Sequence, residues 1–518
     1  MRSQKFSDNG NRSWLVDESV GEYTCGMADQ LILAIDAGTT GNRVLAFSND
    51  QMIVADAYYE FPRTTPKPGW VEQDPDDIWS TTAQALKDVL HAVESENVRA
   101  IGITNQRETT ILWDRVTGAP VGNALVWQDR RTTDACAALA EHSADVKNRT
   151  GLFIDPYFSA TKIAWLLDHH KDLRSRAENG EIAFGTVDSW LIWKLTGGRQ
   201  HVTDPSNASR TLCYNIRTGE YDDTLLSLFN VPRAVLPEVR ASDGDFGSTD
   251  AAITGCEIPI CGVLGDQHAA LFGQLGWEAG VVKNTYGTGL FMMASTGSSI
   301  PDSGRLINTV AWQLGDEVTY AIEGSVFIGG ACVQWLRDGL EIVDTAAETE
   351  VLAESLHDND DVYFVPALAG MGAPYWDPTA RGAIVGLTQG TTRAHLARAA
   401  LEAIAFQTAD LVNELQQATA TSGFDRMRVD GGATANNFLM QFQADVTGLT
   451  IERPVITEST AFGAAALAGL SSGLWSREAL VGGRRIDREF RPALGEAERQ
   501  AAQARWASAV ERALGWAH

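Results

Sequence analysis

The sequence LILAIDAGTTGNRVLAFSND occupies residues 31–50. It predicts a short apolar strand, a loop rich in glycine and threonine at residues 36–40, and a second strand that begins at Arg43. A P-loop or a dinucleotide-binding motif would continue into a helix after its glycines, whereas residues 44–50 indicate a strand and a turn. The loop is therefore predicted to lie at the tip of a hairpin, which excludes the two commonest nucleotide-binding folds.

A hairpin loop of this composition can bind phosphate. Its backbone N–H groups and the hydroxyls of Thr39 and Thr40 can hold phosphate oxygens, and Asp36 offers one carboxylate to a hydrated metal ion. Glycine and threonine are also common turn residues, so an ordinary hairpin remains the alternative.

The composition indicates an ordinary globular protein of two large domains. The chain has 518 residues, of which 44% are hydrophobic and 21% charged. A net charge of -26 argues against general binding to nucleic acid or to an anionic membrane surface. No apolar run approaches the roughly 20 residues that span a bilayer, and no signal core is present, so we expect a cytoplasmic protein without membrane insertion. Residues 1–30 are polar and aperiodic, and are expected to form a disordered tail.

Strands and helices alternate after the first hairpin. Residues 53–60 predict a third strand, and Asp74 followed by Pro75 predicts the capped start of a helix. A buried strand follows at residues 99–104. The alternation indicates an α/β sheet whose function lies in the loops beyond the strand ends, and residues 105–108 form the first such loop.

The second half of the chain repeats the opening pattern. Residues 281–285 and 290–294 predict two strands that enclose a tight loop of glycine and threonine at residues 287–289. This duplication suggests two similar domains that face a common cleft. The predicted division is a tail at 1–30, a first domain at 31–275 and a second domain at 276–518.

Three later elements complete the second domain. Residues 362–366 predict a strand and residues 395–418 a long helix. Residues 427–429 predict another strand, which opens into Gly431 and Gly432. These glycines, with Asn436, would let an adenosine approach the backbone, or could form a simple strand-to-helix turn.

Asp266 and the pair Arg107–Glu108 are the candidate chemical groups. Asp266 follows an apolar strand at residues 260–264, where it could accept a proton from a substrate hydroxyl or merely cap a helix over residues 267–274. Arg107 and Glu108 follow a buried strand and could bind a small polyol, although a surface ion pair is the commoner case. Trp127 and Phe291 are by residue statistics more often core than ligand wall.

Six segments together resemble the FGGY carbohydrate kinases of the actin-like ATPase superfamily, and within them the members that phosphorylate glycerol. The resemblance covers the chain from Leu31 onward. The segments are ITNQRETTILW from Ile101, GLFIDPYFSATK from Gly151, GDQHAALFGQL from Gly265, KNTYGTG from Lys283, GAPYWDPTARGAIVGLT from Gly372 and VDGGATANNFLMQFQAD from Val429.

This resemblance implies an α/β fold of two actin-like (ribonuclease H-like) domains, each a mixed sheet flanked by helices, around a central cleft. It implies transfer of the γ-phosphoryl group of ATP, with Mg²⁺, to glycerol, giving sn-glycerol 3-phosphate in glycerol catabolism. A homodimer or homotetramer is expected. Two alternative hypotheses remain: an FGGY kinase for another polyol or sugar, and a non-catalytic actin-like ATPase.

The resemblance also implies a role for individual residues, with Asp266 as general base and Asp36 near the magnesium ion. The implied glycerol-binding residues are Arg107, Glu108, Trp127, Tyr157, Asp266, Gln267 and Phe291. The implied nucleotide-binding residues are Thr39, Thr40, Gly41 and Arg43 in the first domain and Thr288, Gly330, Gln334, Gly432 and Asn436 in the second.

Two departures from the family pattern stand out. Gly41 occupies a position where the glycerol-phosphorylating members usually carry serine, so one hydroxyl of the phosphate loop is missing. Residues 248–259 lack the glycine and arginine pattern that binds fructose 1,6-bisphosphate in some bacterial members, so inhibition by that sugar is not expected.

Overall fold

The computed structural model describes residues 30–418 and 424–517. The predicted tail therefore lies outside the described residues except for residue 30. The chain forms two compact units: unit 1 runs to Gly273 and adds Val310–Val318 and Thr460–Gly483, and unit 2 holds the remainder. A single boundary near residue 275 leaves both added segments of unit 1 in the second domain.

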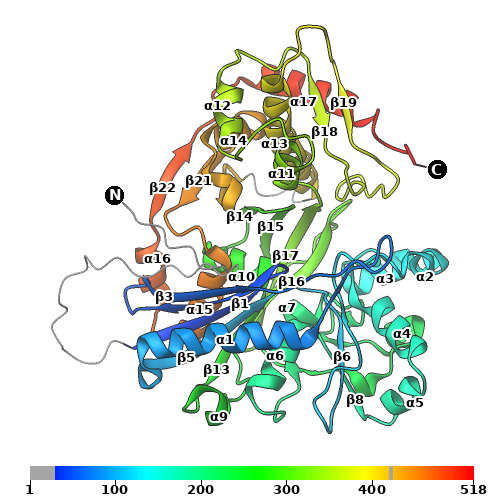
Figure 1. Ribbon diagram of the computed structural model, residues 1–518, viewed down its shortest axis with the longest axis vertical. Coiled ribbons are helices and arrows are strands. Elements are labelled where there is room, and N and C mark those ends of the chain that lie inside the picture. Colours follow the sequence, from blue (N-terminus) through cyan, green and yellow to red (C-terminus); the bar gives the residue numbers. More distant parts are fainter. Residues whose placement is uncertain (1–29, 419–423, 518) are drawn as a thin grey trace, which may run out of the picture. The chain divides into compact units, whose positions relative to one another are not determined.

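Unit 1 is built on a five-stranded mixed sheet (Figure 1). Its strands, in sheet order, are β13 (Ile260–Gly265), β5 (Val98–Asn105), β1 (Leu31–Ala37), β2 (Gly41–Phe47) and β3 (Ile53–Glu60). β1 and β2 are antiparallel neighbours, which confirms the predicted hairpin. β1, β5 and β13 are parallel, with Ala37 beside Asn105 and Asn105 beside Gly265. The carboxyl ends of these three strands therefore meet at one edge of the sheet.

Helices cover both faces of this sheet. α1 (Pro75–Val93) packs against β2 and β3 (Figure 1), and its predicted start is confirmed because the Asp74 carboxylate accepts the N–H of Asp76 at 2.9 Å. Ile101 and Ile103 share an apolar core with residues of α1. The alternate residue Gly102 faces α15 (Ser459–Ser471), where an added Cβ would lie 2.1 Å from the Ala464 carbonyl oxygen.

α15 also lies directly against α10 (Asp266–Gly273). A Cβ at Gly463 would lie 1.8 Å from the carbonyl oxygen of Ala269, so only glycine fits at this contact. The small side chains of α15 let its backbone approach both the sheet and α10. A segment late in the chain thus completes the first unit.

Shorter elements surround the sheet of unit 1. Its paired short strands are β4 (Glu72–Gln73) with β7 (Ala124–Leu125), β6 (Ile111–Asp114) with β8 (Ile182–Gly185), β9 (Val202–Thr203) with β12 (Glu238–Val239), and β10 (Tyr214–Asn215) with β11 (Glu220–Tyr221). The remaining helices are α2 (Thr133–Ala138), α3 (Ser143–Thr150), α4 (Ser159–His169), α5 (Leu173–Glu178), α6 (Val187–Leu195), α7 (Pro205–Ala208), α8 (Asp223–Phe229), α9 (Ala251–Thr254) and α16 (Arg477–Gly483).

Unit 2 is built on a seven-stranded mixed sheet. The strand order is β16 (Ile307–Leu314), β17 (Glu317–Val326), β15 (Leu290–Gly297), β14 (Val282–Tyr286), β20 (Arg426–Asp430), β21 (Thr450–Pro454) and β22 (Ile486–Phe490). The tip of the β16–β17 hairpin is assigned to unit 1. The helices are α11 (Ala331–Asp338), α12 (Glu348–Glu354), α13 (Arg393–Ala418), α14 (Asn437–Thr447) and α17 (Glu496–Val510), and a small β18 (Tyr363–Val365) pairs with β19 (Ala383–Val385).

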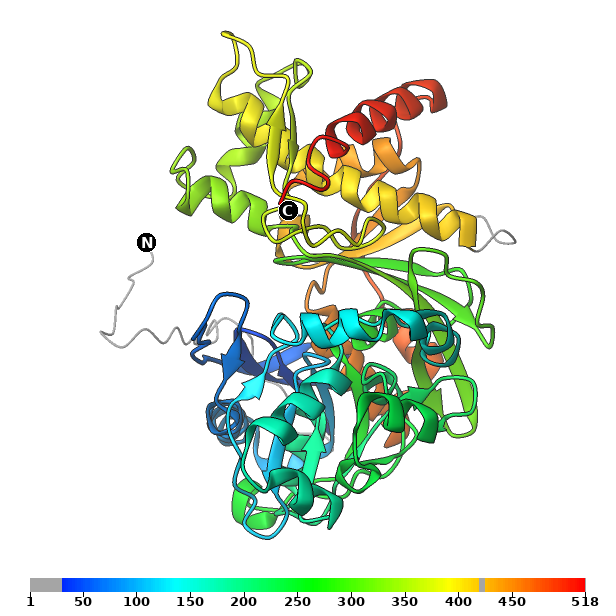
Figure 2. The ribbon, with the colours of Figure 1, turned by 90° about the vertical axis from the view of Figure 1, so that its right-hand side faces the viewer.

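The long helix α13 organises the core of unit 2. Figure 2 shows it in yellow beside the red helix α17. Phe406 of α13 stacks on Trp506 of α17, with ring centroids 5.3 Å apart. The predicted helix and the strands around it are confirmed within two residues at each end. Among the residues that the structure describes, no helix combines the length and apolar character needed to cross a membrane.

Candidate active site

Three loops of unit 1 emerge at the shared carboxyl edge of β1, β5 and β13. They are the phosphate-loop candidate after Ala37, the segment Gln106–Arg107–Glu108 after Asn105, and the start of α10 at Asp266. Gln106 ties the first two together, because its N–H donates to the carbonyl of Ala37 at 2.7 Å. The strand register therefore brings together the groups that the sequence analysis singled out at three distant positions.

Arg107 and Glu108 are buried, so their interpretation as a surface ion pair is wrong. Their exposed fractions are 2% and 1%. Glu108 has φ +56°, and the N–H of Thr109 donates to the carbonyl of Arg107, which closes a three-residue γ-turn centred on Glu108. Hydroxyls of Ser159 and Thr110 donate to the Glu108 carbonyl. A left-handed glutamate held so firmly is typical of functional sites.

Four charges of alternating sign run through this edge of unit 1. Arg210 Nε lies 2.7 Å from Glu108 Oε1, Glu108 Oε1 lies 3.7 Å from Arg107 Nε, and Arg107 Nε lies 3.0 Å from Asp266 Oδ1. Only Asp266 is substantially exposed, at 30% of its side chain. The chain of charges therefore ends in a carboxylate that a ligand can reach.

Asp266 also shapes the start of α10. Its Oδ1 accepts the N–H of Gln267 at 2.7 Å, and its Oδ2 accepts Nε2 of the same glutamine at 3.2 Å. Asp266 is the first residue of α10, and its Oδ1 accepts the adjacent N–H rather than the N–H two or three residues on that a helix cap would accept. The contacts with Gln267 coexist with the contact to Arg107, and the two shortest of them fall on Oδ1.

Two aromatic side chains stand beside these charges. Trp127 and Tyr157 meet edge to face with ring centroids 5.7 Å apart, and the Tyr157 hydroxyl lies 3.5 Å from Nη2 of Arg107. Lys162 holds the backbone beside them, since its Nζ donates to the carbonyl of Tyr157 at 2.9 Å and to that of Val126, the residue before Trp127, at 3.5 Å. Burial lowers the pKa of Lys162 to about 8. A fully buried lysine therefore anchors the backbone beside the two aromatic side chains.

The phosphate-loop candidate is joined to this wall. Trp127 Nε1 donates to the hydroxyl of Thr39 at 3.0 Å, and the Thr40 hydroxyl lies 3.5 Å from that of Tyr58. A Cβ on Gly41 would lie 2.7 Å from the Tyr58 ring and 2.6 Å from the Tyr59 carbonyl oxygen, which explains why glycine is required there. Residues of β3 thus occupy the space that a side chain at position 41 would need.

Arg43 and Asp36 occupy different positions on the hairpin. The Arg43 guanidinium donates to Asp56 at 2.8 Å, so a phosphate would have to share it with this carboxylate. Asp36 is half-buried at the end of β1. Within residues 30–418 and 424–517, no three His, Cys, Asp or Glu side chains form a metal cage. Mg²⁺ usually takes one or two carboxylates together with substrate phosphates, so a single carboxylate beside a phosphate loop fits this ion.

Two groups of buried residues around this edge were not found from the sequence. They are Lys162 and the segment from Asp204 to Arg210, which contains α7. A lysine in a helix and a polar turn carry no local signal that separates them from surface residues. Their burial, at 0% exposure for Lys162, Asp204 and Arg210, is a property of the folded unit alone.

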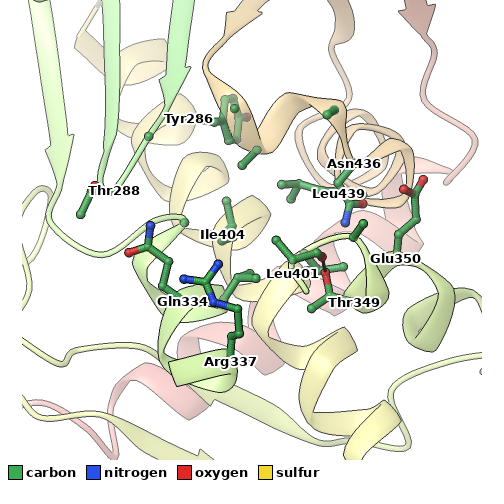
Figure 3. A pocket seen from close by; sticks show the side chains of 18 residues that line it. Tyr286, Thr288, Gln334, Arg337, Thr349, Glu350, Leu401, Ile404, Asn436 and Leu439 are labelled. Carbon is green, nitrogen blue, oxygen red and sulfur yellow. Dashed lines mark hydrogen bonds between the residues drawn. The ribbon is translucent and has the colours of Figure 1, made fainter. Parts of the chain in front are cut away.

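Unit 2 contains a cavity of about 520 Å³, a volume typical of small-molecule sites. Its lining includes all five residues expected to hold ATP from this half, and Figure 3 shows Gln334 and Arg337 projecting from α11 towards it. The lining residues are Tyr286, Gly287, Thr288, Gly330, Val333, Gln334, Arg337, Ala346, Ala347, Thr349, Glu350, Leu401, Ile404, Gly432, Ala433, Ala435, Asn436 and Leu439.

Glycines let three backbone segments meet at this cavity. The Gly330 N–H donates to the carbonyl of Gly287 at 2.9 Å. Gly431 has φ +91°, and a Cβ there would lie 2.5 Å from the Tyr286 carbonyl oxygen. Asn436 caps α14, since its Oδ1 accepts the N–H of Leu439 at 2.9 Å. The apolar wall from α13, Leu401 and Ile404, was not predicted because such positions look like ordinary core.

Phe291 also lies in unit 2, on β15, and is half-buried. Its carbonyl accepts Nζ of the fully buried Lys283 at 3.2 Å. Lys283 is also close enough to Asp430 to oppose the rise in that residue's pKa that burial causes. Asp430 directly precedes Gly431. The buried charges of Lys283 and Asp430 therefore lie next to the Phe291 backbone and the glycine turn.

Comparison with known proteins assigns the fold to a family. The profile of the FGGY carbohydrate kinase N-terminal domain matches residues 31–273, and that of the C-terminal domain matches residues 282–472. The chain belongs to the FGGY family of carbohydrate kinases. Two relatives are similar over nearly their whole lengths. Glycerol kinase of Deinococcus radiodurans is 51% identical over 94% of this chain and 98% of its own, and glycerol kinase 2 of Thermotoga maritima is 52% identical over 94% and 99%.

Solved FGGY structures agree with the two-unit fold. A Plasmodium falciparum glycerol kinase with ADP matches 94% of this chain and 98% of its own at 35% identity and a TM-score of 0.87. A gluconate kinase from Lactobacillus acidophilus matches 93% and 97% at 22% identity and a TM-score of 0.83. The second likeness concerns the fold alone. The expected α/β fold of FGGY type, with a mixed sheet and flanking helices in each unit, is confirmed.

Proposed function

We propose that this FGGY protein is an ATP-dependent kinase that phosphorylates glycerol to sn-glycerol 3-phosphate. The main support for this function is the arrangement at one sheet edge of unit 1. There the buried pair Arg107–Glu108 lies next to the partly exposed carboxylate of Asp266. Relatives about 50% identical over nearly the whole chain are named glycerol kinases, which supports glycerol as the acceptor.

Glycerol would be held by hydrogen bonds from its hydroxyls to both donors and acceptors of the protein. Arg107 donates N–H groups and Glu108 accepts, so together they can bind two hydroxyls of a triol, while Trp127 and Tyr157 cover its carbon chain. Gln267 and, from unit 2, Phe291 complete the proposed set. Because buried polar groups would stay unpaired with a ligand that lacks a hydroxyl, this arrangement favours polyols.

Asp266 would act as general base. As the hydroxyl oxygen of glycerol attacks the γ-phosphorus, its proton passes to the Asp266 carboxylate, an O–P bond forms, and the bond to the ADP oxygen breaks. Thr39, Thr40, the backbone at Gly41 and Arg43 would hold phosphate oxygens. Asp36 would hold Mg²⁺, which neutralises charge on the phosphates.

The nucleotide would use the cavity of unit 2. Thr288, Gly330, Gln334, Gly432 and Asn436 line it and would hold ATP at its adenosine side. The glycine-lined backbone admits a flat ring, and Leu401 and Ile404 give it an apolar floor. We further propose a cytoplasmic homodimer or homotetramer.

A coupled assay tests the proposal directly. ADP release is measured with glycerol, xylulose, gluconate and no acceptor, at saturating MgATP. Turnover that requires glycerol and yields glycerol 3-phosphate supports the proposal. Turnover with a sugar only indicates an FGGY kinase for another substrate. ATP hydrolysis that no acceptor stimulates, or no turnover at all, indicates an actin-like protein that is not a kinase.

A further inference from the structure

The side chain of Glu108 depends on a partner 102 positions away in the sequence. Arg210 is fully buried, and its Nε donates to Glu108 Oε1 at 2.7 Å. Arg107 is the weaker partner of this carboxylate, because its Nε lies 3.7 Å from Glu108 Oε1 but 3.0 Å from Asp266 Oδ1. Of these contacts, the shortest to Glu108 comes from Arg210 and the shortest to Asp266 comes from Arg107.

Arg210 also contacts the aromatic side of the acceptor site. Its guanidinium carbon lies 5.7 Å from the centre of the Tyr157 ring and 5.2 Å from that of Phe158. These are cation–π distances, which hold a planar guanidinium in one orientation. Arg210 is therefore fixed between Glu108 and the aromatic wall.

The segment that carries Arg210 is itself fixed by Asp204. This fully buried carboxylate caps α7, accepting the N–H and side-chain groups of Ser206 and Asn207, and also the hydroxyl of Ser242 at 2.7 Å. The N–H of Arg210 donates to the carbonyl of Asn207 at 3.0 Å. The buried cap at Asp204 thus fixes the position of the backbone from which the Arg210 side chain extends.

The same segment holds two strand ends of the active edge. The Ser206 hydroxyl accepts the N–H of Gly265, the residue before Asp266, at 2.9 Å. The Asn207 Oδ1 accepts Nδ2 of Asn105 at 3.0 Å. The segment therefore contacts the supports of both the proposed base and the Arg107–Glu108 turn.

We propose that Arg210 is a positioning residue for the acceptor, which fixes the Glu108 carboxylate in the orientation that receives a hydroxyl. The inference rests on the proposed function. Without Arg210, Glu108 competes with Asp266 for Arg107, and the acceptor loses two aligned groups at once. Arg210 itself lies behind Glu108 and acts through it.

The test is a double-mutant cycle of Arg210→Met and Glu108→Gln, measured by kcat/KM for glycerol and KM for ATP. Arg210→Met is expected to lower kcat/KM for glycerol by about 10- to 150-fold, the range for one lost charged hydrogen bond, with KM for ATP within about 3-fold. In the Glu108→Gln background, the same change is expected to alter kcat/KM by less than about 3-fold. An equal loss in both backgrounds would overturn the proposal.

A matched control separates positioning from stability. Arg398→Met removes another arginine–glutamate pair, also 2.7 Å long, from unit 2, where the side chains of Arg398 and Glu402 are 11% and 4% exposed. It is expected to lower Tm while glycerol kinetics stay within about 3-fold. If Arg210→Met does not fold, Arg210→Lys replaces it in the cycle. The proposal then requires that Arg210→Lys lower kcat/KM for glycerol in the wild-type background and change it by less than about 3-fold in the Glu108→Gln background. Wild-type enzyme that fails to phosphorylate glycerol refutes the proposed function, whereas an active wild type with an unaffected Arg210→Met variant refutes this inference alone.

Discussion

The Nε atom of Arg107 lies 3.0 Å from Oδ1 of Asp266, with the arginine 2% exposed and the aspartate 30% exposed. The cation is thus behind the carboxylate, and the carboxylate faces the accessible side. A base in this position keeps a lone pair for a ligand while its charge is balanced from within the protein.

Replacement of this carboxylate is expected to abolish most turnover. Asp266→Asn keeps the size of the side chain but cannot take up the proton of the acceptor hydroxyl, so kcat should fall by about 10²- to 10⁴-fold. KM for ATP should stay within about 3-fold, since the cavity in unit 2 is unaltered. Steady-state kinetics check this. A near-normal kcat would mean that Asp266 serves only to start α10.

Arg107→Met is expected to weaken acceptor binding. Loss of a charged hydrogen bond costs roughly 1.5 to 3 kcal/mol, which corresponds to a rise in KM for glycerol of about 10- to 150-fold. The measurement compares KM for glycerol with KM for ATP in the same preparation. A rise confined to ATP would contradict the placement of the acceptor beside Arg107.

A larger side chain at Gly432 is expected to obstruct the nucleotide. A Cβ there meets no atom within 4 Å, so Gly432→Leu should fold while its side chain projects at the rim of the cavity. KM for ATP should rise by at least about 10-fold, the effect of about 1.4 kcal/mol, with little change in KM for glycerol. Gly482→Leu is the control, because a Cβ at Gly482 also meets nothing within 4 Å and lies outside the cavity lining. Equal kinetics of the two variants would place the nucleotide elsewhere.

The stability of unit 1 should depend on pH through Asp188. Burial raises the pKa of this carboxyl to about 7, and the nearby Asp204 adds to the rise, while hydroxyls of Thr186 and Thr203 oppose it. Between about pH 4 and 7 the folded state therefore binds more protons than the unfolded state, so the free energy of unfolding falls as pH rises through this window.

Asp188→Asn removes this titration. The loss of stability between pH 5 and pH 8 should shrink by about 1 to 3 kcal/mol relative to wild type. Urea unfolding at the two pH values, with Asp76→Asn on the exposed first turn of α1 as control, measures the difference. Identical pH dependence in wild type and Asp188→Asn would show that another group is responsible.

Local patterns in the sequence predicted much of the fold. The hairpin around the glycine–threonine loop, the cap at Asp74 and the strands that end at Asn105 and Gly265 follow from turn residues and apolar periodicity. Parallel strands place their carboxyl ends together, which is why the three loops of the active edge could be anticipated.

Long-range partners account for what the sequence could not predict. The buried carboxylate of Glu108 pairs with Arg210, which no local pattern links to it. Leu401 and Ile404 have the spacing of any core-facing helix, so nothing marks them as cavity lining. The placement of α15 in unit 1 rests on contacts such as that of Gly463 with Ala269.

That contact has a consequence for the order in which the protein can be made. A ribosome that has translated residues 1–273 has supplied every strand of the first sheet but not α15, which packs on Gly102 and Ala269. The sheet face beneath α15 therefore stays uncovered while almost 200 further residues, from Gln274 to Ser459, are synthesised. Most of unit 2 is therefore synthesised before unit 1 is complete, and the part of the first sheet that α15 covers stays open until residues 459–471 have emerged.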